Sequence, residues 1–205
     1  MTTPDVATPA TPPRERIVNA AYELFSRRGI RAVGTDQVIE RAGVAKATLY
    51  RHFATKDDLV LAVLQRREEV WTRGLIEAQS RERGNTPEEQ LLAIFDVMHD
   101  WFQHRDGYEG CSFINVLLEL GADHPAGQAS VAHIDNVRDI VRRRATAAGL
   151  SDIEDFAWSW HILMKGAIIL AAVGDLNAAV RAQKMARTLI EQHRSPTPMA
   201  NEGVG

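Results

Sequence analysis

Residues 35–58 contain two short helical patterns separated by a glycine, and this stretch constrains the fold more than any other. Thr35 stands where a helix N-cap is expected, because its hydroxyl can accept a hydrogen bond from an unpaired backbone N–H. Gly43 follows the first pattern and supplies the left-handed backbone that a sharp turn between helices needs. The stretch therefore predicts two short helices joined by a tight turn.

The second of these helices, predicted over residues 46–53, has two chemically different faces. Leu49 and Phe53 stand four residues apart and therefore share the buried face. Cationic, hydroxyl and aromatic side chains occupy the free face: Lys46, Thr48, Tyr50, Arg51 and His52. A short helix with such a free face is typical of a protein that reads the major groove of DNA.

An ordered series of residues surrounds this pair of helices. It consists of Ala20, Ala21, Leu24 and Phe25, then Gly29, Thr35 and Ile39, then AGVAKATLYRHF, then Lys56 and Leu59. Between about Ile17 and Leu59 the chain thereby resembles the TetR family of bacterial transcriptional repressors. A helix-turn-helix alone occurs in many folds, whereas this ordered series is specific.

The resemblance implies a role for each residue of the free face. It places five residues on DNA phosphates: Thr35, Thr48, Tyr50, His52 and Lys56. It places three near the base edges: Lys46, Ala47 and Arg51. Arg51 is expected to read a guanine, because a guanidinium can donate two hydrogen bonds to that base. For each of these residues a solvated surface position is the alternative, and for Tyr50 the alternative is a half-buried aromatic residue of the core.

Two departures from the family pattern concern the same helix. Ala45 stands where the family usually has a serine N-cap, and Ala47 stands where glycine is common. Loss of a side-chain cap costs about 1 kcal/mol of helix stability. The alanine at 47 offsets part of this loss through its helix propensity.

Charge is distributed unevenly along a chain whose net charge is −3. The segment Arg14–Arg67 has 11 Lys and Arg against 6 Asp and Glu, and the remainder has 13 against 21. A basic segment on an acidic body suits a protein that places one end on phosphate. One cysteine, no signal peptide and no apolar run long enough to cross a membrane predict a cytoplasmic protein.

The whole chain is predicted to be all-α, with about nine helices. They cover residues 13–28, 35–42, 46–53, 55–79, 86–104, 112–120, 125–148, 151–173 and 175–193. Three capping boxes mark helix starts, at Thr55–Asp58, Thr86–Glu89 and Ser151–Glu154, and Asp175 is expected to cap the last helix. We expect a disordered leader (1–12), a homeodomain-like helix-turn-helix domain (13–60), a larger helical domain for ligand binding and dimerisation (61–194) and a disordered tail (195–205).

The last two predicted helices are too apolar for a small domain to cover easily. A helix that is apolar on all sides must be covered on all sides. We therefore expect them to form a four-helix interface in a homodimer, which the resemblance also implies. The expected interface residues are Phe156, Trp160, Leu163, Ala167, Leu170, Met185 and Leu189. Packing within a monomer core is the alternative.

A homodimer can place two recognition helices in successive major grooves of a palindromic operator in double-stranded DNA. The resemblance also implies release by a small-molecule inducer, bound in the larger domain. Large apolar side chains and a few polar groups are the candidate ligand-binding residues: Trp71, Trp101, Phe102, Phe113, Asn115, Glu119, His133, Trp158 and His161. Filling of an ordinary core is the alternative for each aromatic residue.

Other chemistries have weaker support in the sequence. Cys111 near His104 suggests a redox sensor, and scattered histidines suggest a metal sensor, within the same DNA-binding dimer. No histidine pair has metal-ligand spacing, and no phosphate loop or nucleophile elbow is present. We therefore predict no metal, no cofactor and no catalytic residue. A helical interaction protein and an enzyme remain as alternatives.

Overall fold

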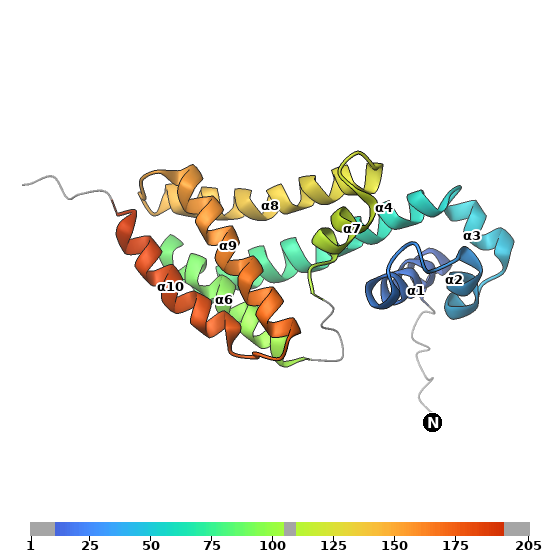
Figure 1. Cartoon of the computed structure of the whole chain (residues 1–205), viewed down its shortest axis with the longest axis horizontal. Coiled ribbons are helices and arrows are strands. Elements are labelled where there is room, and N and C mark those ends of the chain that lie inside the picture. The colour runs from blue at the N-terminus through green and yellow to red at the C-terminus, as the bar shows by residue number, and fades with distance from the viewer. Residues whose placement is uncertain (1–10, 105–109, 195–205) are drawn as a thin grey trace, which may run out of the picture. The chain divides into compact units, whose positions relative to one another are not determined.

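The computed structural model describes residues 11–104 and 110–194, which form helices and no β-strand (Figure 1). The elements are α1 (Pro13–Arg28), α2 (Thr35–Ala42), α3 (Lys46–His52), α4 (Lys56–Arg67), the π-helix η1 (Glu68–Gln79), α5 (Ser80–Arg83), α6 (Pro87–Gln103), α7 (Ser112–Leu120), α8 (Pro125–Ala147), α9 (Ile153–Ala172) and α10 (Ala178–Gln192). Because α4, η1 and α5 follow one another without a break, the described residues form nine separate helices. The predicted all-α class is confirmed.

The chain divides into two compact units. Unit 1 comprises residues 1–67 and 112–131, and unit 2 comprises 68–111 and 132–205. The sequence placed a single boundary after residue 60, so the assignment of α7 to the N-terminal unit is a difference from that expectation. The predicted leader and tail fall almost entirely on residues 1–10 and 195–205, which lie outside the described residues.

The core of unit 1 is formed by one face of each N-terminal helix. α1 packs against α2, α3 and α4. The buried side chains include Ile17, Ala21, Phe25, Val33, Val38, Leu49, Phe53, Leu59 and Leu64. Gly43 ends α2 with φ 62° and ψ 44°, which confirms the left-handed turn that the sequence predicts.

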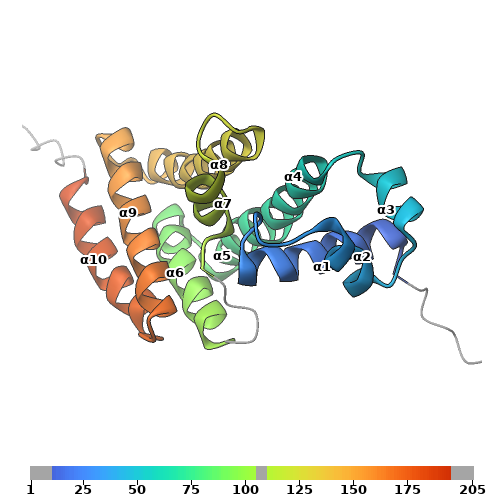
Figure 2. The same ribbon diagram turned by 45° about the vertical axis from the view of Figure 1, so that its right-hand side comes forward.

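The core of unit 2 lies where α9 packs against α10 and α10 against α6, and both ribbon views show these helices side by side (Figures 1 and 2). Trp160 is fully buried, with its ring centroid 5.2 Å from that of Phe95 and 5.3 Å from that of Phe156. Phe156 and Ala167 are buried in the same core. The prediction that Phe156, Trp160 and Ala167 form a dimer interface is therefore wrong, because this chain's own helices cover them.

Two of the three predicted capping boxes are present. Thr55 and Asp58 exchange reciprocal hydrogen bonds at the start of α4, and Thr86 and Glu89 do so at the start of α6. The box predicted at Ser151 is wrong. The Ser151 hydroxyl donates instead to the His193 carbonyl oxygen at 3.0 Å.

The starts of α9 and α10 differ accordingly from the prediction. Asp152 takes the N-cap position of α9 in a left-handed conformation, with φ 48°. Asn177 is the N-cap of α10, while the Asp175 carboxylate accepts hydrogen bonds from the Asn177 amide and the Arg181 guanidinium. The local sequence predicted the helices but not their N-caps. One reason is that the Ser151 side chain makes a long-range hydrogen bond to His193 instead of capping α9.

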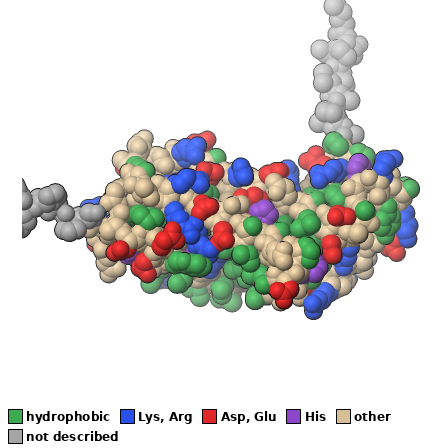
Figure 3. All heavy atoms as spheres, turned by 90° about the horizontal axis from the view of Figure 1, so that it is seen from above, with side chains coloured by type: hydrophobic (Ala, Val, Ile, Leu, Met, Phe, Trp, Pro, Cys, Tyr) green, Lys and Arg blue, Asp and Glu red, His purple; other side chains and the backbone are tan. Residues whose placement is uncertain are grey.

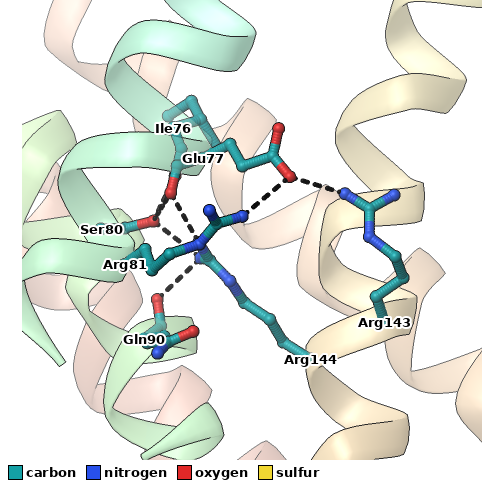
Figure 4. A network of polar contacts seen from close by, with 7 residues as sticks. All are labelled: Ile76, Glu77, Ser80, Arg81, Gln90, Arg143 and Arg144. Carbon is teal, nitrogen blue, oxygen red and sulfur yellow. Dashed lines mark hydrogen bonds and ion pairs between the residues drawn. The ribbon is translucent and has the colours of Figure 1, made fainter. Parts of the chain in front are cut away.

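The buried Arg144 connects α8 to η1, α5 and α6 (Figure 4). Its guanidinium donates to the Ser80 hydroxyl at 2.7 Å and to the carbonyl oxygens of Glu77 at 2.8 Å and Gln90 at 3.0 Å. Burial, reinforced by the nearby cation Arg81, lowers the pKa of Arg144 to about 10, so the side chain stays charged at neutral pH. The backbone carbonyl oxygen of Glu77, near the end of η1, therefore accepts a hydrogen bond from a buried guanidinium.

Candidate nucleic-acid interface

The first helix of the helix-turn-helix, α2, has Gly34 and not Thr35 as its N-cap. Gly34 has the extended backbone of an N-cap (φ −83°, ψ 158°), and Thr35 is already the first helical residue. The prediction that Thr35 is the N-cap is therefore wrong. Its hydroxyl instead lies 3.2 Å from the Tyr50 hydroxyl, which joins α2 to the free face of α3.

The recognition helix α3 has the predicted division into two faces. Leu49 and the C-cap residue Phe53 are buried. The exposed residues are Lys46, Ala47, Tyr50, Arg51 and His52, and Thr48 is half-buried. Ala45 occupies the N-cap with an extended backbone. It provides no capping hydrogen bond, because a methyl side chain has no acceptor. The helix therefore presents one polar, cationic face to solvent.

Contacts around this face leave its charge accessible. Lys46 Nζ lies 3.5 Å from an Asp36 carboxylate oxygen, and both side chains are largely exposed. Such a surface ion pair is weak and exchanges readily for a phosphate contact. On α1, Arg16 donates to the Gly43 carbonyl oxygen at 3.4 Å, and the Arg14 guanidinium lies 5.3 Å from the Phe53 ring centroid. The sequence reasoning missed these two cations, because only folding brings the start of α1 to the turn.

Lys56 has a more specific environment than the other predicted phosphate contacts. It is half-buried, and its Nζ donates to the Ile30 carbonyl oxygen at 2.5 Å in the loop between α1 and α2. The same ammonium lies 6.0 Å from the Phe25 ring centroid. Lys56 therefore holds this loop to the start of α4, and a phosphate contact from it stays a prediction.

The candidate ligand-binding residues fall into both units. Phe113, Asn115 and Glu119 belong to α7 in unit 1, whereas the other six belong to unit 2. Glu119 is engaged by the α1–α2 loop, where its carboxylate accepts hydrogen bonds from the backbone amides of Ile30 and Arg31 at 2.9 and 2.6 Å. The predicted set is thus not one cluster within one domain.

In unit 2, several of these residues have partners within the chain. The ring of buried Trp71 lies edge-on to that of Trp101, with centroids 5.7 Å apart. Trp158 is 50% exposed and stacks under the Arg138 guanidinium at 3.7 Å. Phe102 is buried.

The two histidines of the set differ in their surroundings. His133 Nδ1 lies 3.3 Å from a carboxylate oxygen of buried Glu68. Burial would raise the pKa of Glu68, but hydrogen bonds from His133, Thr72 and Asn136 outweigh it and lower that pKa. His161 is 6% exposed, and neither ring nitrogen has a hydrogen-bond partner. Burial, with the cations Lys165 and Arg138, lowers the pKa of His161 to about 3.

The structure also describes the surroundings of the residues considered for redox sensing and metal binding. Cys111 is buried, and the Lys165 ammonium lies 3.4 Å from its sulfur. Across residues 11–104 and 110–194, no three His, Cys, Asp or Glu side chains gather in a way that suits a metal ion. None of the helices in these ranges has the length and apolarity needed to cross a membrane.

The fold and the free face of α3 define a helix-turn-helix protein, and known proteins are similar to it in sequence and in fold. Residues 17–63 match the sequence model of a family described as bacterial regulatory proteins, tetR family. The HTH-type transcriptional activator FasR of Mycolicibacterium smegmatis is 33% identical over 131 residues, which cover 63% of this chain and 59% of FasR. The uncharacterised HTH-type transcriptional regulator YvkB of Bacillus subtilis is 38% identical over 50% of this chain and 51% of its own length.

Solved structures extend the likeness to nearly the whole chain. A TetR-family transcriptional regulator from Streptomyces coelicolor superposes with a TM-score of 0.81 at 26% identity, covering 89% of this chain and 96% of that one. Residues 17–63 thus carry the helix-turn-helix of the tetR family of bacterial regulatory proteins, and the fold of the chain is similar to that of a TetR-family transcriptional regulator. The matches to FasR and YvkB span only about half to three fifths of those relatives. These relatives carry the names of transcriptional regulators and not of enzymes.

Proposed function

We propose that this protein is a cytoplasmic repressor of transcription that binds a palindromic operator as a homodimer and is released by a small-molecule inducer. The observation that carries the proposal is the exposed face of α3, where Lys46, Tyr50 and Arg51 stand on a helix anchored by buried Leu49 and Phe53. This arrangement suits insertion of one helix into a major groove. The match of residues 17–63 to the tetR family supports the same function.

Dimerisation is supported by an apolar stripe on α9, although not by the residues that the sequence selected first. Trp158, Ile162, Ile169 and Val173 recur at helical spacing and are 50–78% exposed. Leu170 on α9 and Met185 on α10 are also exposed, at 47% and 61%, while Leu163 and Leu189 are half-buried. Figure 3 shows hydrophobic side chains gathered at the lower left of the face in view. We propose that a second copy covers this stripe.

The inducer acts in this proposal by shifting a conformational equilibrium. A ligand can favour the DNA-free state only to the extent that it binds that state more tightly than the DNA-bound state. Loss of operator binding should therefore depend on ligand concentration and saturate. Measuring this loss requires the operator sequence, which must be identified first.

Selection from a random duplex library tests the proposal. Purified protein is used to capture DNA, and the retained duplexes are sequenced. We expect a two-fold symmetric consensus, because two recognition helices related by a dyad read two half-sites. Retention of sequences without a shared motif would contradict specific operator binding.

Activation is the second candidate for the direction of regulation, because FasR of Mycolicibacterium smegmatis is named a transcriptional activator. A reporter placed downstream of the selected site separates the two. Repression predicts a rise in transcription when the protein is removed, and activation predicts a fall.

A further inference from the structure

A cavity of about 220 Å³ lies inside unit 1, between α1, α4 and α7. Most of its wall is apolar and includes Phe25, Val60, Val63, Leu64 and Val116. An apolar cavity of about 150 Å³ accommodates benzene, so this one can hold about nine non-hydrogen atoms. The cavity is separate from the aromatic residues of unit 2 that the sequence analysis selected.

The lining of the cavity also includes groups that can donate hydrogen bonds. The Ser112 hydroxyl oxygen is buried, and within residues 11–104 and 110–194 no group accepts a hydrogen bond from it or donates one to it. The Arg67 guanidinium donates to the Tyr22 hydroxyl at 3.2 Å and lies 5.9 Å from the Tyr22 ring centroid. A buried hydroxyl without a partner is unfavourable unless a ligand or water completes its hydrogen bonding. Together with the adjacent cation, it favours a ligand that accepts hydrogen bonds and carries negative charge.

A third polar lining residue connects the cavity to the DNA-binding helices. Glu119 lines the cavity, and its carboxylate accepts hydrogen bonds from the amides of Ile30 and Arg31. Lys56 donates to the carbonyl oxygen of Ile30. The loop that leads into α2 is therefore held by α7 through its amides and by α4 through a carbonyl. We call these three hydrogen bonds the loop clamp.

We propose that this cavity binds a small amphipathic carboxylate, with its apolar part against α1 and α4 and its carboxylate toward Ser112 and Arg67. The bound carboxylate repels that of Glu119, because two like charges in one partly enclosed site raise each other's free energy. Occupation thereby weakens the loop clamp and loosens the entry to α2. Only the consequence for operator binding rests on the proposed function; ligand binding and the loop response do not.

Titration of the full-length protein with octanoate, followed by methyl NMR, tests the binding site. We expect saturable shifts at Val60, Val63, Leu64 and Val116, and smaller effects from octanol, which lacks the carboxylate. Absence of shifts at millimolar octanoate, or shifts confined to unit 2 methyls such as Val137 and Ile168, would overturn the proposal. Equal affinity for octanol and octanoate would overturn the role of Ser112 and Arg67.

A pair of variants on α7 provides a matched control. Val116→Trp fills the cavity, whereas Leu118→Trp adds the same side chain at a position that is 78% exposed. We expect at least a tenfold loss of octanoate affinity in the first variant and none in the second. Equal affinity in both variants places the ligand elsewhere. Should Val116→Trp fail to fold, Ser112→Ala gives a smaller test, with an expected loss of octanoate but not octanol affinity.

Hydrogen exchange of the Ile30 and Arg31 amides tests the loop clamp without DNA. Octanoate should accelerate both, and Glu119→Gln should reduce the ligand's effect because it removes one of the two repelling charges. Protection that is unchanged by saturating octanoate would contradict the coupling. Failure of operator binding in separate experiments would leave these two readouts intact and would count only against the proposed function.

Discussion

At the scale of single residues, Arg51 and Lys56 carry the same charge in different environments. Arg51 is exposed on the free face of α3, whereas Lys56 is half-buried and hydrogen-bonded to the Ile30 carbonyl oxygen. A planar guanidinium can recognise a guanine edge, while an ammonium acts on phosphate as a point charge. The two residues should therefore affect DNA binding in different ways.

Arg51→Ala should reduce affinity for the selected operator by about 1–3 kcal/mol and relax specificity at one base pair of each half-site. Fluorescence anisotropy with the operator and with single-base variants measures both effects. Lys56→Ala is the comparison, and it should weaken binding to all duplexes alike and reduce the salt slope by about one. A uniform loss in Arg51→Ala would contradict its base-reading role.

His161 should make stability depend on pH. The unfolded chain binds a proton at this residue near pH 6.5, whereas burial beside Lys165 and Arg138 lowers the folded-state pKa to about 3. The contribution of neutral His161 to the free energy of unfolding is therefore fully present above pH 6.5. It is lost as the pH falls below that value, by about 1.4 kcal/mol per pH unit. Urea unfolding between pH 7 and about 5, where carboxylates contribute little, measures this slope.

His161→Leu removes the titrating group and should flatten the slope in this range. His52→Ala removes an exposed histidine and should leave it unchanged. A slope that is the same in His161→Leu and in the unmodified protein would show that another group is responsible.

At the scale of elements, α3 is short and begins without a side-chain cap. Ala45→Ser places a hydroxyl at an N-cap position whose backbone is already extended, so it should stabilise the protein by about 0.5–1 kcal/mol. Thermal unfolding followed by circular dichroism measures the gain. Ala47→Ser, at the second residue of the same helix, is the control and should give no gain, because serine within a helix is less favourable than alanine.

Arg144 connects η1, α5 and α6 to α8, and its removal should destabilise unit 2. Arg144→Met leaves the Ser80 hydroxyl and the carbonyl oxygens of Glu77 and Gln90 without their partner, at a cost of about 3 kcal/mol. Arg143→Met is the matched control. Its side chain is 61% exposed and makes a surface ion pair with Glu77, so the loss should stay below about 1 kcal/mol. Similar losses from both variants, in denaturant unfolding, would argue against the role of burial.

At the scale of the whole molecule, the α9 stripe is the surface that we propose a second copy covers. Ile169→Arg places a charge at a position that is 62% exposed in the single chain. If a second copy covers this position, sedimentation velocity should show conversion from dimer to monomer, because an unpaired charge would be buried at the interface. Leu118→Arg, at an exposed position of α7, should sediment as the unmodified protein does. A dimer that tolerates Ile169→Arg would place the interface elsewhere.

Sequence determined the helices themselves and the helix-turn-helix, since both depend on neighbours within one or two turns. Gly43 permits the left-handed turn, and the spacing of Leu49 and Phe53 places both side chains on one face of α3. The reciprocal caps at Thr55 and Thr86 are equally local. These features could be predicted because no distant residue competes for the same groups.

Tertiary structure decided which apolar and polar groups are left for binding. Trp160 and Ile162 look alike in an apolar helix, but packing against α6 and α10 buries Trp160 and leaves Ile162 exposed. Glu119 is distant in sequence from the loop amides that it accepts hydrogen bonds from. Helical periodicity predicts which side chains share a face but not which face a distant helix covers. The exposed stripe on α9 and the cavity in unit 1 could therefore not be predicted from the sequence.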